Sequence, residues 1–165
     1  MHKLLLYFLF MGLLFGCKKE VTSESNENAE AKYISFQNTS ENVTFNQEAD
    51  SILNAWPEYQ ALQNSFDVMY RAANNEDLVL AIDDLLEKEK VLTESKYPLV
   101  FDNVQIKSRQ KVVRTFLLKI KASLKEQTNI EEPIKQMLTA KNAYHNQFNI
   151  ITSSKLDAKL ILNEN

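Results

Sequence analysis

The sequence has very little glycine: its two glycines, Gly12 and Gly16, both precede Cys17. Every residue after Cys17 carries a Cβ atom, so the tight turns that need positive φ are poorly accessible there. This disfavours an all-β fold. It also excludes glycine-rich phosphate loops and dinucleotide-binding loops, whose backbones must approach the ligand closely.

Cysteine and histidine are also scarce, with one cysteine and two histidines, His2 and His145. A single cysteine cannot form a disulfide within the chain, and this set is too small for a zinc site. No residue near His145 marks a nucleophile with a base and an orienting group, so we expect a packing role for it. Asp83 and Glu87 offer too few oxygens for calcium. The sequence predicts no catalytic residue, no metal and no cofactor.

The first residues have the pattern of a signal peptide. His2 and Lys3 precede an apolar run, residues 4–15, which is too short for a bilayer core that needs about 20 helical residues. The run ends in Leu14-Phe15-Gly16-Cys17, which resembles the lipobox of bacterial lipoproteins. The resemblance covers residues 1–20. A free reactive thiol at Cys17 is the alternative interpretation.

The resemblance implies cleavage between Gly16 and Cys17 and acyl chains on Cys17. Two or more acyl chains hold a protein firmly on a membrane. Lys18 stands where an aspartate would signal retention in the inner membrane, so the resemblance implies the outer membrane, facing either the periplasm or the cell surface. With 19 basic and 22 acidic side chains, the chain has a net charge of −3, which argues against nucleic acid as a partner.

The rest of the chain divides into a tether and a helical domain. Residues 18–30 are polar and cannot bury enough surface to offset the entropy lost on ordering. Residues 31–45 contain Tyr33, Ile34, Phe36, Val43 and Phe45, which predict a short extended arm that docks on the domain, with a hairpin as the alternative. We therefore expect a signal peptide over 1–16, a lipidated cysteine with tether and arm over 17–45, and a helical domain over 46–162.

Apolar residues recur at steps of three and four from residue 46 onward, which predicts helices. The first predicted helix follows Thr44, and Pro57 either kinks it or divides it into two. The others follow Asn74-Asn75, Asp102 and Thr128 as caps. Short connections between long amphipathic helices indicate antiparallel neighbours. The predicted fold is all-α, an up-down antiparallel bundle of three long helices plus a proline-kinked first helix.

The apolar stripes of these helices predict the core. Lys141 lies within the last stripe, where its amine either reaches water at the end of the bundle or pairs with a buried carboxylate. The predicted inward residues are Ile52, Trp56, Tyr59, Leu62, Phe66, Met69, Ala73, Leu78, Ile82, Leu85, Leu86, Leu92, Val104, Val113, Phe116, Leu117, Ile120, Leu124, Ile134, Met137, Tyr144, Phe148 and Ile151.

Charge is strongly segregated between two of the predicted helices. Residues 76–94 are mainly acidic and residues 103–127 mainly basic. One interpretation is that the two helices are neighbours and attract each other through their flanks. The other is a basic face that meets lipid phosphates or an acidic partner. This anion-binding face would consist of Lys107, Lys111, Arg114, Lys121 and Lys125.

Aromatic residues at helical spacing are typical of a core, but they can also line a pocket. Trp56, Tyr59, Tyr144 and Phe148 are the candidate pocket residues, because a break at Pro57 would open space beside Trp56. Two functions follow as hypotheses. The chain is a membrane-anchored interaction or scaffold module with an envelope protein partner, or it binds a small ligand or anionic lipid through the aromatic pocket or the basic face.

The lipobox resemblance predicts the effect of removing the thiol. We expect Cys17→Ser to block acylation and to shift the protein out of the membrane fraction, since thioether formation requires the sulfur. Metabolic labelling with palmitate and mass spectrometry of the natural product measure this directly. An unprocessed chain beginning at Met1, or equal labelling of the variant, would contradict the prediction.

Overall fold

The computed structural model describes residues 43–163, with side chains as far as Ser154, and this part of the chain is all-helical. This confirms the predicted all-α class. The predicted signal peptide, including Gly16 and Cys17, lies outside the described residues, as do the tether and residues 31–42 of the arm. The helices are α2 Gln47–Asn54, α3 Pro57–Met69, α4 Asn75–Glu94, α5 Val104–Lys125 and α6 Glu131–Asn163.

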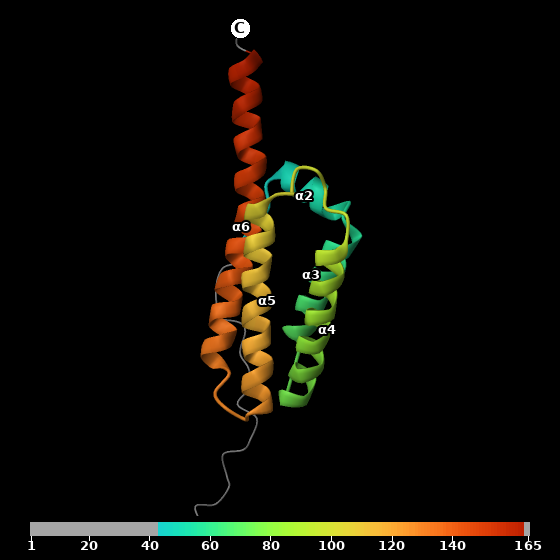
Figure 1. The fold of residues 1–165 in the computed structure, drawn as a ribbon, viewed down its shortest axis with the longest axis vertical. Coiled ribbons are helices and arrows are strands. Elements are labelled where there is room, and N and C mark those ends of the chain that lie inside the picture. The colour runs from blue at the N-terminus through green and yellow to red at the C-terminus, as the bar shows by residue number, and fades with distance from the viewer. Residues whose placement is uncertain (1–42, 164–165) are drawn as a thin grey trace, which may run out of the picture. The chain divides into compact units, whose positions relative to one another are not determined.

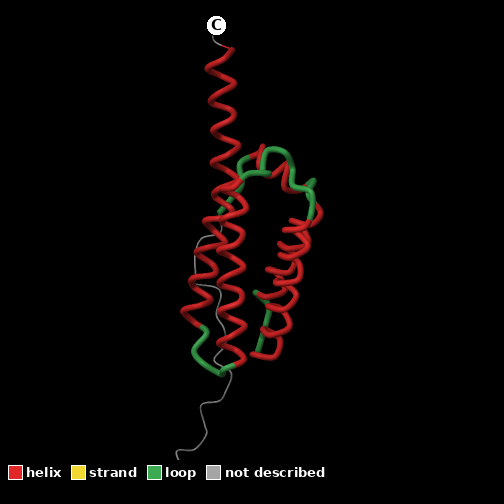
Figure 2. Tube along the Cα trace, in the orientation of Figure 1, coloured by secondary structure: helices red, strands yellow, loops and turns green. Residues whose placement is uncertain are grey.

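Helix α5 lies between α4 and α6 and packs against both of them (Figure 1). Helix α3 packs against α4, and the short α2 contacts α3 and α6. The loops that join successive helices are short (Figure 2). One cluster of buried apolar side chains draws on all five helices and on Phe101 in the α4–α5 loop. The described helices thus share a single core.

The chain divides at Pro57 into two helices and does not form one kinked helix. Helix α2 ends at Asn54, and Trp56 is extended, with φ −109° and ψ 95°. Pro57 then occupies the first position of α3. Proline lacks an N–H and its ring clashes with a preceding helical turn, but the first turn of a helix needs no such donor. The sequence had left this division open as the alternative to a kink.

Asparagine caps three of the helices. Asn46, Asn74 and Asn103 accept hydrogen bonds through Oδ1 from the N–H groups of Ala49, Asp77 and Ile106, at 2.8, 2.7 and 3.0 Å. Each asparagine is extended and directly precedes its helix. A side-chain oxygen in this position satisfies an N–H that has no partner within the helix.

The predicted caps at Thr44, Asp102 and Thr128 are therefore wrong by one or two residues. The Thr44 carbonyl accepts from the Asn149 side chain, and Asp102 pairs with Lys107. The Thr128 hydroxyl donates to the carbonyl of Ser123, whereas Asn129 accepts from the N–H of Glu131 at 2.8 Å. Serine, threonine, aspartate and asparagine are comparably good caps, so the choice between adjacent candidates depends on the loop before each helix.

Most of the predicted inward residues are buried, including the whole stripe of α4. Val104 and Ala73 are exceptions: Val104 is 75% exposed, and Ala73 lies on the surface beyond the end of α3. Ile106, which was not predicted as inward, is fully buried. Val104 was predicted to be buried but is exposed, because it is the first residue of α5 and its side chain faces solvent.

The beginning of the described chain is fastened to α6. The Asn46 N–H donates to Asn149 Oδ1 at 2.9 Å, and Asn149 Nδ2 donates to the Thr44 carbonyl at 2.8 Å. Asn46 Nδ2 also lies 2.8 Å from the hydroxyl of Thr152. Phe45, the last residue of the predicted arm, packs against His145 with ring centroids 5.0 Å apart. These contacts hold residues 44–46 against α6.

The α5 cap supplies a test with an adjacent control. We expect Asn103→Ala to lower the free energy of unfolding by about 1 kcal/mol, because the Ile106 N–H loses its acceptor. Asp102→Ala removes only an exposed ion pair and should change this free energy by less than about 0.5 kcal/mol. Urea denaturation followed by circular dichroism measures both. Equal losses in the two variants would contradict the assignment of the cap.

Candidate functional site

A buried carboxylate joins α4 to α5. Glu89 is 1% exposed, and its Oε2 lies 2.5 Å from the guanidinium of Arg114. Its Oε1 accepts from Gln110 Nε2 at 3.0 Å and from the Thr93 hydroxyl at 2.9 Å. A charge taken out of water is costly unless it is paired and hydrogen-bonded, and these contacts meet both requirements.

Gln110 extends this network into the α4–α5 loop. Its Oε1 accepts from the Tyr97 hydroxyl at 2.6 Å, while its Nε2 also reaches the Thr93 hydroxyl at 2.8 Å. Burial raises the pKa of Tyr97, so the phenol stays protonated as a donor. Gln110 is 2% exposed and is satisfied at both ends of its amide. No sequence pattern predicted a role for Gln110, since glutamine is not expected within an apolar stripe.

Three residues of the predicted anion-binding face are paired with carboxylates in the structure. Arg114 binds Glu89, Lys121 lies 2.7 Å from Asp83, and Lys107 pairs with Asp102. Lys107 also stands over the Tyr97 ring, 5.0 Å from its centroid. Lys111 and Lys125 are exposed on α5. The Arg114 and Lys121 pairs join α5 to α4, as expected if the acidic and basic helices attract each other as neighbours, whereas Asp102 lies in the loop just before α5.

The four residues of the predicted aromatic pocket lie together in the core. Trp56 stacks on Tyr59 with centroids 5.8 Å apart, and Phe148 lies 5.5 Å from Tyr59 and 4.7 Å from Tyr144. None of the four is more than 3% exposed. A ligand would reach these rings only if the helices moved apart, so their observed contacts are those of a packed core.

His145 and Lys141 are buried on the same side of α6. The Tyr59 hydroxyl lies 3.3 Å from His145 Nε2, and burial together with nearby Lys141 lowers the pKa of His145 to about 3. The ring is therefore neutral, and its Nε2 can accept a hydrogen bond from the Tyr59 hydroxyl. Lys141 is 5% exposed, with its ammonium 5.2 Å from the Phe66 ring centroid and 5.4 Å from that of Tyr70. Burial lowers the pKa of Lys141 below its ordinary value, and the charge of Asp67 offsets part of this effect.

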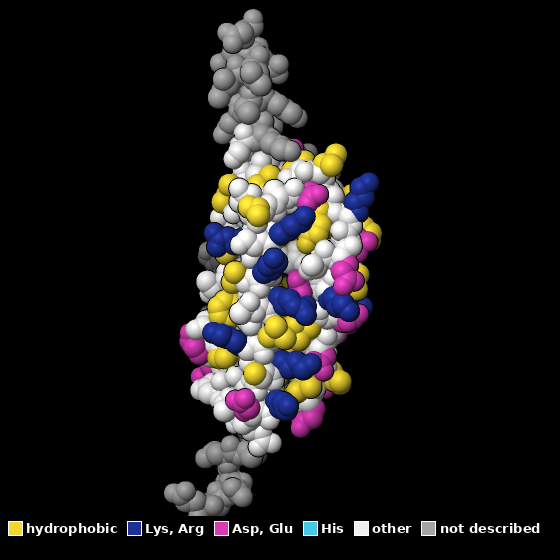
Figure 3. Space-filling view, viewed as in Figure 1, with side chains coloured by type: hydrophobic (Ala, Val, Ile, Leu, Met, Phe, Trp, Pro, Cys, Tyr) yellow, Lys and Arg dark blue, Asp and Glu magenta, His cyan; other side chains and the backbone are white. Residues whose placement is uncertain are grey.

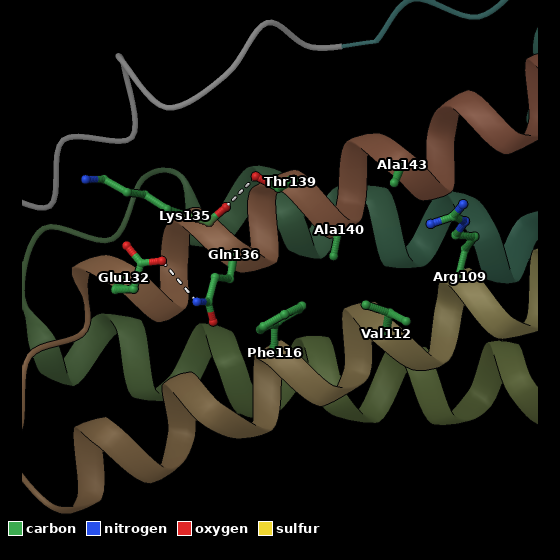
Figure 4. A pocket seen from close by; sticks show the side chains of 9 residues that line it. All are labelled: Arg109, Val112, Phe116, Glu132, Lys135, Gln136, Thr139, Ala140 and Ala143. Atoms are coloured by element: carbon green, nitrogen blue, oxygen red, sulfur yellow. Dashed lines mark hydrogen bonds between the residues drawn. The ribbon is translucent and has the colours of Figure 1, made fainter.

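A groove of about 380 Å³ runs between α5 and α6 (Figure 4). Its apolar lining is Val112 and Phe116 from α5 and Ala140 and Ala143 from α6. The short side chains on α6 leave the space that a larger residue would fill. The groove is also lined by Arg109, Glu132, Lys135, Gln136 and Thr139.

Cations surround the apolar part of the groove. Arg109 stands at one end and Lys135 at the other, where its side chain extends outward from the rim (Figure 4). Lys119 lies over the Phe116 ring, with its ammonium 5.0 Å from the centroid. The acid at this site, Glu132, accepts from Gln136 Nε2 at 3.0 Å. Three cations against one carboxylate make the site complementary to an acidic, partly apolar partner.

Sequence reasoning missed these groove residues. Arg109, Val112, Phe116 and Lys119 follow one another at steps of three and four, so the sequence contained their stripe. The alternation of apolar and basic residues also fits the edge of a buried face, and Phe116 was predicted to point inward. The small side chains of α6 turn this edge into an open groove, and their position depends on how the two helices pack.

The chain matches no protein-family model, no curated protein and no solved structure. Among the described residues, no helix has the length and apolar character needed to cross a membrane. Within the same part of the chain, no group of three or more His, Cys, Asp or Glu side chains is placed to hold a metal ion.

Burial of His145 predicts a pH-dependent stability. Above pH 6.5 the ring is neutral in both the folded and unfolded states, and the stability is complete. As the pH falls from 6.5 towards 3, only the unfolded chain takes up this proton, so stability is lost. We expect the free energy of unfolding to fall by about 2 kcal/mol more between pH 7 and pH 5 in the natural protein than in His145→Gln. Urea denaturation at each pH measures it, and parallel profiles would refute the assignment.

Proposed function

We propose that this chain is a lipid-anchored protein of the bacterial cell envelope whose helical domain is an interaction module. The lipobox-like residues ending at Cys17 support the anchor, with the outer membrane as its location. In this proposal the three long helices α4, α5 and α6 form an up-down antiparallel bundle. The bundle holds the α5/α6 groove open toward an envelope protein partner.

The groove is the observation that carries the proposal. Arg109, Val112, Glu132, Lys135 and Thr139 all line it and are all exposed, so it is open along its length. Small-molecule sites usually enclose most of the ligand surface, which an open groove does not do. A helix that lays its apolar stripe into the groove would keep its other face in water. The geometry therefore favours an amphipathic helix as the occupant.

The surrounding charges favour an acidic partner. Arg109 and Lys135 flank the apolar lining, and Lys119 lies over the exposed side of Phe116. Carboxylates beside the apolar stripe of a docked helix would find a cation at each end of the groove. Such pairs contribute more to orientation and partner choice than to affinity.

The proposal assigns no catalytic chemistry to the domain. His145 is the only histidine after Cys17, and it is buried, neutral and bonded to the Tyr59 hydroxyl. A general base has to lie within hydrogen-bonding reach of its substrate, and this ring is covered. The buried carboxylate, Glu89, is already neutralised by Arg114. The exposed chemistry of the domain is that of a binding surface.

Photo-crosslinking in intact envelopes tests the groove. We expect a photoreactive phenylalanine analogue at Phe116 to give a protein adduct in the full-length chain, since this position lines the groove. The matched control is the same analogue at Leu118, also on α5 and 46% exposed but outside the groove. Electrophoresis and mass spectrometry identify the adducts.

The kinds of adduct decide between the hypotheses. An adduct with protein at position 116 and none at 118 supports the interaction module. Adducts with phospholipid alone at position 116 would favour the binding protein for an anionic lipid. Equal adducts at both positions, or none at either, would overturn the proposal for the groove.

A further inference from the structure

Helix α4 presents to solvent a stripe with the properties that the groove calls for. Its outward residues follow at steps of four and three and comprise four carboxylates and two apolar side chains. Leu80 is 70% exposed and Val91 is 43% exposed. The stripe consists of Glu76, Leu80, Asp83, Glu87, Val91 and Glu94.

The stripe and the groove match in length. Leu80 and Val91 are about three turns apart, which places their Cα atoms about 16 Å apart along the axis of α4. Glu132 and Ala143, the outermost residues of α6 that line the groove, are separated by the same number of residues and therefore also by about 16 Å. The segment of α4 from Leu80 to Val91 can thus span the groove from one end to the other.

The charges of the two surfaces are complementary. Glu76, Glu87 and Glu94 are exposed on α4, while Arg109, Lys119 and Lys135 surround the groove. Figure 3 shows Lys and Arg side chains along the middle of one face, over α5, and Asp and Glu side chains gathered toward the edge formed by α4, where some Lys or Arg side chains lie among them. Within the stripe, Asp83 already pairs with Lys121 of its own chain.

We propose that α4 of one copy of this chain docks into the α5/α6 groove of a second copy. This inference rests on the proposed function of the groove and names its occupant. Within one chain, α5 lies between α4 and α6, so a helix α4 cannot reach the groove of its own molecule (Figure 1). The stripe and the groove of each copy are therefore both available to neighbours.

The contact joins two different surfaces, which has a structural consequence. Such a heterologous contact does not close on itself after two copies, but continues into a ring or an open chain. The contact is small, about three helical turns, so each one is weak in solution. Anchoring many copies on one membrane raises their effective concentration and lets weak contacts form a continuous array.

Crosslinking between differently tagged copies tests this pairing. Glu87 lies in the middle of the stripe and Thr139 lines the groove, so this choice does not depend on the direction in which α4 docks. Full-length Glu87→Cys and Thr139→Cys proteins, each with its own tag, are expressed together and treated in envelopes with a short bis-maleimide. Chains anchored on one membrane meet often, so the control pair, Glu87→Cys with Leu118→Cys, measures the yield from random encounters. We expect the yield of heterodimer to be at least about tenfold above that of this control.

The single variants and the unsubstituted chain complete the crosslinking experiment. The chain without new cysteines reports any reaction at Cys17, and this background is subtracted. One chain carrying both Glu87→Cys and Thr139→Cys should give a ladder of multimers, because each copy then reacts at both surfaces. A heterodimer yield equal to that of the Leu118→Cys pair would overturn the inference, as would a double variant that stops at dimers.

Charge reversal supplies a second, independent measurement. Glu87→Lys should reduce crosslinking between Leu80→Cys and Thr139→Cys chains, and Arg109→Glu with Lys135→Glu on the groove chain should restore it. Circular dichroism of each purified variant checks folding, and all the substituted side chains are exposed. A reversal without effect, or one that no groove substitution rescues, would count against the pairing.

The outcome for self-association is distinguishable from that for the proposed function. If the analogue at Phe116 captures a different protein while the cysteine pairs give no heterodimer, the groove is a docking site and only its occupant was misassigned. If the analogue captures nothing, the proposed function fails together with this inference.

Discussion

Burial of the Glu89 carboxylate is the constraint on which the arrangement of α4 and α5 depends. Apolar side chains alone allow two packed helices to adopt several registers, since one leucine can often take the place of another between the side chains of the facing helix. A buried charge is less tolerant, because it is stable only where Arg114, Gln110 and Thr93 all reach it. The packing of these two helices is therefore tied to one position along their length and one rotation about their axes.

The rotation of α5 about its axis also determines which of its other side chains face the core and which face α6. With Gln110 and Arg114 turned toward α4, Val113 and Leu117 enter the core. Arg109 and Phe116 then face α6, where short side chains leave the groove. A glutamate that has no contact with the groove thus determines which side chains line it.

Helix α6 has two faces with different roles. One face carries Tyr144, His145 and Phe148, whose rings pack around Tyr59 of α3. The side toward α5 carries Ala143 and, at its buried edge, Ala140, and these short side chains leave space. Because the packed rings hold one side of α6 in place, the helix does not shift toward α5 to close the space on its other side. This combination suits a surface that binds a partner while the domain itself remains rigid.

The sequence by itself determined the helices and most of the core. Scarce glycine and apolar steps of three and four are local properties, and they predicted an all-α fold and the buried stripe of α4. Pro57 predicted an interruption, but not whether it would be a kink or a division into two helices. The exact caps depended on the loops, so Asn46 and Asn103 are the caps in place of the predicted Thr44 and Asp102.

Only the tertiary structure decided which lysines and arginines remain available to a partner. Lys107, Arg114 and Lys121 looked equivalent to Arg109 and Lys119 in the sequence. Packing of α4 against α5 brought Arg114 and Lys121 to carboxylates, while Lys107 pairs with Asp102 in the preceding loop. Arg109 lines the groove, and Lys119 lies over the Phe116 ring. Periodicity fixes the face of a helix on which a residue lies, whereas the partner of that face depends on contacts between residues far apart in the chain.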